Sequence, residues 1–85
     1  MKHESHPEII ARLRRVEGHV KSLIAMMQDG RSCIDLAQQM HAVEKAVGSA
    51  KRELIHDHIE HCFADGSEGD ARASLAEIKQ LAKYL

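Results

Sequence analysis

Residues 32–63 of this 85-residue chain have the sequence SCIDLAQQMHAVEKAVGSAKRELIHDHIEHCF. Apolar residues recur in this stretch at alternating steps of four and three, which places them along one face of a helix. These residues are Leu36, Met40, Val43, Val47, Ala50 and Leu54. The pattern predicts a single long helix over residues 32–63, and the rest of the chain is organised around it.

The apolar stripe continues at both ends into residues that can bind a metal ion. Cys33 lies three residues before Leu36, and His58 and Cys62 lie four and eight residues after Leu54. At about 100° per residue, the rotation from Cys33 amounts to about 20° one way for His58 and about 20° the other way for Cys62. All three side chains therefore share one face of a straight helix.

These three residues cannot meet within one chain, because Cys33 and His58 are separated by roughly 37 Å along the helix axis. A second copy of the helix, packed antiparallel on the same stripe, would bring Cys33 of one chain near His58 and Cys62 of the other. The sequence therefore predicts a two-fold dimer with two identical sites. Two thiolates and an imidazole suit a thiophilic transition metal rather than calcium or magnesium.

The remaining sequence predicts two further helices and no strands. Residues 1–6 are expected to be mobile, and Pro7 is suited to the first turn of a helix over residues 7–28. That helix carries its own stripe at steps of four and three, and a third helix is expected over residues 70–84. We expect an all-α fold with three helices per chain, in which two chains form an antiparallel four-helix bundle. Each chain is expected to form a single helical domain over residues 1–85.

Composition limits the classes of function. One chain of 85 residues covers a helix of some thirty residues poorly, which favours an oligomer. No apolar run is long enough to span a membrane, and the polar start MKHESHPE is not a signal peptide, so we expect a cytoplasmic protein. In that compartment two cysteines are more often ligands or redox sensors than a structural disulfide.

The net charge of −1 conceals an uneven distribution. Eight basic and four acidic residues lie between Arg12 and Arg52, whereas residues 53–70 hold six acidic residues and no lysine or arginine. One region could face phosphates while the other surrounds a cation. The alternative is an ordinary solvated surface of mixed charge.

Local signals bear on two of the candidate site residues. Ser32 is a good N-cap and Asp35 completes a capping-box-like pair, so Cys33 falls in the first turn, where the helix dipole favours a thiolate. Glu77 lies beside the apolar face of the third helix. It could accept a hydrogen bond from the ring nitrogen of His58 that does not bind metal; the alternative is an exposed carboxylate.

The sequence resembles the CsoR/RcnR family of small bacterial repressors, which sense copper, nickel or cobalt, formaldehyde, or persulfides. The resemblance covers nearly the whole chain and combines the Cys33, His58, Cys62 spacing with four sequence blocks. The blocks are RLRRVEGH at residues 12–19, DGRSC at 29–33, QQMHAV at 38–43 and HIEHC at 58–62.

The resemblance implies a helical dimer that pairs into a homotetramer and binds double-stranded operator DNA as apo-protein, with release on metal loading. It assigns Cys33 of one protomer and His58 and Cys62 of its partner as ligands, and aligns Glu77 with a supporting carboxylate. It also places Arg12 on an arginine used against DNA. Glu17 and Ser49 depart from the family, since many members are basic at the first position and some at the second. The basic residues that could compensate are Arg14, Arg15, Lys45, Lys51 and Arg52.

The effector depends on a fourth ligand. Cys-His-Cys alone suits trigonal Cu(I), whereas an added nitrogen from His3, His6 or the terminal amine suits Ni(II) or Co(II). Nickel and cobalt sensors of the family resemble this chain in carrying an N-terminal histidine, so we favour Ni(II)/Co(II) with His3 as the first candidate, His6 as the second and Cu(I) as the alternative. The set of Cys33, His58 and Cys62 argues against formaldehyde and persulfide sensing.

Two other classes of function compete with a repressor. Cys33 and His58 could act across the dimer as a nucleophile and its base, but nothing in the sequence suggests an oxyanion hole or a substrate cleft. We therefore expect neither an enzyme nor a small-molecule substrate. A helical metal buffer that does not bind DNA is the second competitor.

Overall fold

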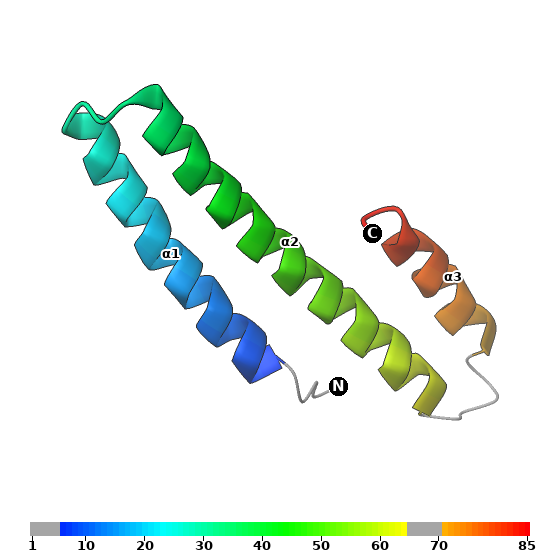
Figure 1. Cartoon of the computed structure of the whole chain (residues 1–85). Coiled ribbons are helices and arrows are strands. Elements are labelled where there is room, and N and C mark those ends of the chain that lie inside the picture. The colour runs from blue at the N-terminus through cyan, green and yellow to red at the C-terminus, as the bar shows by residue number, and fades with distance from the viewer. Residues whose placement is uncertain (1–5, 65–70) are drawn as a thin grey trace.

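A computed structural model of the chain contains three helices in the order α1 (His6–Gln28), α2 (Cys33–Ala64) and α3 (Ala71–Ala82). The structure describes residues 6–64 and 71–85, without the side chains of residues 62–64, 71 and 73. In these ranges all regular structure is helical, as predicted. α1 and α2 form an antiparallel hairpin, and α3 lies beside the second half of α2 (Figure 1).

The long central helix is continuous. α2 holds 32 residues without a break, including Gly48 at its midpoint. α1 begins one residue before the predicted start at Pro7. α3 is shorter than the expected 70–84, because the amides of Lys83 and Tyr84 bond to the carbonyls three residues back and tighten the chain into turns.

The apolar stripe of each helix contains both buried and exposed residues. On α1, Ile9, Val16 and Leu23 are buried or half-buried, whereas the intervening members of the stripe are exposed. On α2, Leu36, Val43 and Ala50 are similarly covered. The exposed members are Leu13, Val20 and Met27 on α1, and Met40, Val47 and Leu54 on α2. One edge of each stripe therefore closes the hairpin, and the other edge has no cover within the described part of the chain.

The shape of the monomer explains this exposure. The chain measures 57 × 23 × 13 Å and has a radius of gyration of 17.5 Å, against about 12 Å for a compact domain of this length. Among the described side chains only Ile9, Leu23, Ala50 and Ile55 form a buried core. None of the described helices combines the length and the hydropathy needed to cross a membrane.

Candidate functional site

The turn between α1 and α2 presents Cys33 at the start of the long helix. Gly30 adopts φ +76°, and its amide and that of Arg31 donate to the carbonyls of Met27 and Met26, at 3.2 and 3.1 Å. This Schellman arrangement ends α1. Ser32 then caps α2, since its Oγ accepts from the amide of Asp35 at 3.1 Å. Cys33 is the first helical residue and carries a free, exposed thiol.

His58 lies near the other end of α2, where α3 packs against it. Its Nε2 is 2.8 Å from Oε1 of Glu77, and the imidazole is 22% exposed against 53% for the carboxylate. With Nε2 turned toward Glu77, Nδ1 is the nitrogen that would bind a metal ion. A carboxylate behind the imidazole is the usual support of a metal-binding histidine, so His58 and Glu77 fit a metal centre.

The ligands predicted for one site are not gathered in one chain. Twenty-five residues of unbroken helix hold Cys33 and His58 roughly 37 Å apart along α2. No three His, Cys, Asp or Glu side chains in the described part of the chain lie together as a metal site. His3 and the side chain of Cys62 lie outside the described residues, so their predicted roles stay predictions.

His6 is the first residue of α1 and is half-buried, with its Nε2 shielded from solvent. The hairpin register follows from Arg12, whose guanidinium reaches Ser49 and Glu53 on α2. Six residues toward the start of α1 correspond to six toward the end of α2, about 9 Å in each helix. His6 therefore lies near the turns of α2 that carry His58.

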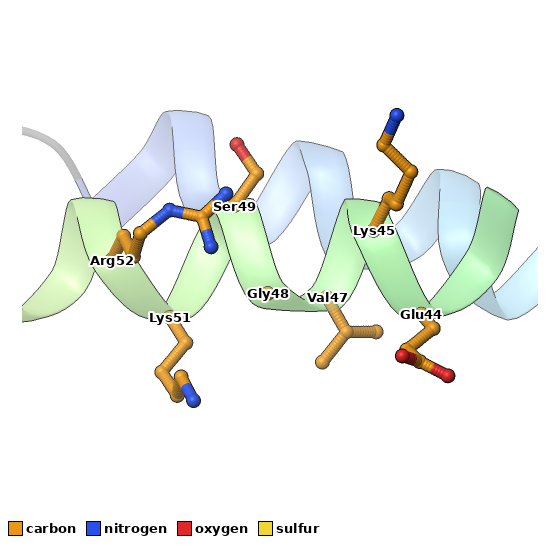
Figure 2. A pocket seen from close by; sticks show the side chains of 7 residues that line it. All are labelled: Glu44, Lys45, Val47, Gly48, Ser49, Lys51 and Arg52. Atoms are coloured by element: carbon orange, nitrogen blue, oxygen red, sulfur yellow. The ribbon is translucent and has the colours of Figure 1, made fainter. Parts of the chain in front are cut away.

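A basic cluster lies on the middle of the hairpin; we use this term for Arg12, Lys45 and Arg52. Lys45, Ser49 and Arg52 lie within about 60° of one another around α2. Figure 2 shows Lys45 and Ser49 on one side of the helix, with Arg52 extending along the helix toward Ser49. Arg12 joins them from α1 by donating from Nη1 to Ser49 Oγ at 3.0 Å.

The other predicted DNA-binding residues lie elsewhere. Lys51 projects from the opposite side of α2, beside Val47 and Glu44 (Figure 2). These side chains line an open groove along α2 together with Lys45, Gly48, Ser49 and Arg52. Arg14 and Arg15 are exposed on α1, and Arg14 is about 200° around the helix from Arg12, away from the cluster. The structure thus brings together three of the six basic residues.

The partners in two contacts between α1 and α2 could not be identified from the sequence. Arg12 Nη1 lies 3.2 Å from Oε1 of Glu53, and His19 Nε2 lies 2.6 Å from Oε1 of Gln39. Ser49 was noted only as a departure from the family, yet it accepts the Arg12 hydrogen bond. The register of the hairpin would have revealed these pairs, but periodicity alone does not fix the register.

A helical hairpin with a thiol and an imidazole at opposite ends of one helix, and a basic cluster between them, is the arrangement expected of a helical metal sensor that binds DNA. A family model described as "Metal-sensitive transcriptional repressor" matches residues 5–85. The chain belongs to this family, the CsoR/RcnR family, and is a metal-sensing transcriptional repressor. Family membership thus supports a repressor rather than an enzyme.

Individual relatives are named for different metals. The chain is 33% identical over 87 residues to the copper-sensing transcriptional repressor CsoR of Bacillus subtilis, covering 98% of this chain and 86% of that protein. It is 35% identical over 77 residues to the copper-sensing repressor RicR of Mycobacterium tuberculosis, covering 79% and 80%. The solved nickel-responsive transcriptional regulator InrS superposes with a TM-score of 0.85 at 31% identity, covering 100% and 98%.

Proposed function

We propose that this chain binds operator DNA as apo-protein and releases it when Ni(II) or Co(II) binds, which derepresses genes for metal efflux or resistance. The observation that carries the proposal is the placement of Cys33 and His58 at opposite ends of an unbroken α2 in a member of a metal-sensitive repressor family. Glu77 beside His58 supports the assignment of this imidazole as a ligand.

Each site is completed by a second copy of the chain. Cys33 of one protomer meets His58 and Cys62 of an antiparallel partner, which gives two sites per dimer. The exposed apolar edge of the hairpin, including Met40, Val47 and Leu54, supports this packing because soluble monomers rarely expose so long a stripe. Two such dimers pair as a tetramer, as the family resemblance implies.

The position of His6 favours nickel or cobalt over copper. Its side chain lies near the turns of α2 that carry His58, so the N-terminal segment can supply a nitrogen ligand from His6, His3 or the terminal amine. A fourth nitrogen suits Ni(II) or Co(II), whereas three ligands suffice for Cu(I). The nickel-responsive InrS is similar over the whole chain, while the copper-sensing names of CsoR and RicR keep Cu(I) as the alternative.

The protein converts ligand binding into DNA release through its geometry. When bound, the metal ion supplies bonds between soft donor atoms of two protomers. Cys33 of one protomer is then tied to the end of the partner's α2 and to the N-terminal segment that lies beside that end. If the DNA-competent arrangement holds these residues apart, the metal favours the released state and shifts the population.

A fluorescence-anisotropy titration on operator DNA tests this function. The apo-protein should bind with an affinity that falls steeply with salt, because lysine and arginine contacts to phosphates dominate. Addition of nickel or cobalt should weaken binding, by about five- to 150-fold for a typical allosteric coupling. Binding that stays unchanged with nickel, cobalt and copper would leave a formaldehyde sensor or a persulfide sensor, whereas no operator binding at all would leave a metal buffer.

The fourth ligand has its own test. Replacement of both His3 and His6 by alanine should lower the affinity for nickel and change the visible absorption spectrum of the nickel complex, while Cu(I) affinity stays near wild type. Undiminished nickel affinity in this variant would remove both histidines as ligands. If nickel affinity falls in the double variant, the two single variants distinguish His6, which has a defined place beside α2, from His3.

A further inference from the structure

Arg12 is held by a single nitrogen of its guanidinium. Nη1 donates to Ser49 Oγ at 3.0 Å and lies 3.2 Å from Glu53 Oε1. An arginine nitrogen of this type carries two hydrogens, so these two contacts engage Nη1 fully. Both partners lie on α2, one turn apart, and fix the arginine of α1 against the second helix.

The opposite edge of the guanidinium is available for another ligand. Nε and Nη2 make no hydrogen bond or ion pair with any residue that the structure describes. The Nε hydrogen and one of the two Nη2 hydrogens lie on one edge of the planar fork, the edge that binds a phosphate through two parallel hydrogen bonds. The Arg12 side chain is 33% exposed, so this edge can be reached from solvent.

The charged residues around Arg12 favour the binding of a polyanion. Lys45 and Arg52 flank Ser49, and Arg52 Nη1 passes 3.5 Å from the position of a Cβ at Gly48, so its guanidinium lies along the helix surface. Glu53 is the acidic residue at the edge of this cluster, and its carboxylate is paired with Arg12. With Glu53 included, the cluster keeps two net positive charges.

We propose that Glu53 and Ser49 are positioning residues that hold Arg12 so that its Nε and Nη2 edge meets a phosphate of the operator. The inference rests on the proposed function, because it presumes that Arg12 contacts DNA. An arginine fixed before binding loses less side-chain entropy when it meets the phosphate, which raises affinity. Glu53, although acidic, thus contributes to DNA binding.

The opposite role for Glu53 would be competition with the phosphate for Arg12. The DNA affinities of the Glu53→Ala and Glu53→Gln variants distinguish the two roles. Glutamine keeps an acceptor oxygen for Nη1 without the charge, so under positioning Glu53→Gln binds nearly as wild type and Glu53→Ala binds more weakly. Under competition both variants bind DNA more tightly than wild type.

The experiment measures operator affinity of the full-length apo-protein at several salt concentrations. Arg12→Ala should weaken binding about tenfold or more and lower the salt slope by about one. Glu53→Ala should weaken it about three- to tenfold, and should cost nothing further in the Arg12→Ala background. Ser49→Ala, which leaves the ion pair in place, should give a smaller loss that also disappears in that background.

Glu44→Ala is the matched control, because it removes the same charge from the same helix without a contact to Arg12. It should bind as wild type or slightly more tightly. Circular dichroism and nickel affinity of each variant check that the fold and the metal site persist. Glu53→Ala binding as tightly as wild type, or an undiminished Glu53→Ala effect without Arg12, would overturn the inference. Wild-type affinity in Arg12→Ala would instead refute the DNA contact of Arg12.

Discussion

His58 Nε2 lies 2.8 Å from Oε1 of Glu77, which joins the end of α2 to the middle of α3. The contact was anticipated from the position of Glu77 beside the apolar face of the third helix. It directs one ring nitrogen toward α3 and leaves the other for the metal ion that we propose. Under the proposed function, the short third helix therefore has a role beyond packing, since Glu77 would orient a metal ligand supplied by α2.

Glu77→Ala should lower metal affinity without unfolding the protein. Loss of the carboxylate that orients a metal-binding histidine typically costs 10- to 100-fold in metal affinity. Stability should change little, because Glu77 is more than half exposed and surface pairs contribute little. Nickel competition with a chelator measures the affinity, and Glu60→Ala, an exposed carboxylate on α2, is the control. Equal affinities for the two variants would contradict the role of Glu77.

Mixing two inactive variants tests whether each site is shared between chains. Cys33→Ser and His58→Ala should each lose high-affinity binding. In a mixed dimer, however, Cys33 of one chain meets His58 and Cys62 of the other. After unfolding and refolding together at equal amounts, the mixture should recover about a quarter of the wild-type sites, because half the dimers are mixed and each has one intact site.

Nickel titration of the refolded mixture gives this fraction directly. Each variant refolded alone is the control and should remain without high-affinity sites. No recovery in the mixture, while both variants are helical and dimeric, would mean that the ligands of a site come from one chain.

Val47→Glu should break the dimer. Val47 is 43% exposed in the single chain and lies midway along the uncovered apolar edge, so a carboxylate there would be buried without a partner on association. Sedimentation should show monomers, and metal affinity should fall with them. Ile34→Glu is the control, since Ile34 is 73% exposed and lies off the predicted stripe. A dimeric Val47→Glu protein with intact metal sites would exclude this edge as the interface.

Periodicity predicted the helices and the common face of Cys33 and His58, because a straight helix converts spacing into position. It could not separate Leu13 from Val16, which belong to one stripe although the first is exposed and the second half-buried. The separation depends on the side from which α2 approaches α1. The same limitation explains why the most buried described side chain, Ile55, was not singled out.

The sequence was least informative where long polar side chains cross between helices. Arg12, Ser49 and Glu53 meet because the hairpin register sets residue 12 against the third quarter of α2. A shift by one turn would move the guanidinium to other partners with the same helices and the same stripe. Residue types at known spacing predict ligands along one helix, but contacts between helices need coordinates.

Replacement by alanine should have opposite effects on stability at Gly30, in the turn that presents Cys33, and at Gly18, inside α1. Gly30→Ala should destabilise the fold by about 1 kcal/mol, because φ of +76° is unfavourable for a residue with a Cβ. Gly18→Ala should stabilise it by up to about 1 kcal/mol, since Gly18 lies inside α1 and an added Cβ meets nothing within 4 Å in the described chain. Urea unfolding at one fixed protein concentration measures both, because association contributes to apparent stability. Equal effects of the two substitutions would mean that Gly30 does not end α1 in the left-handed conformation, and the placement of Cys33 at the first turn of α2 would lose its support.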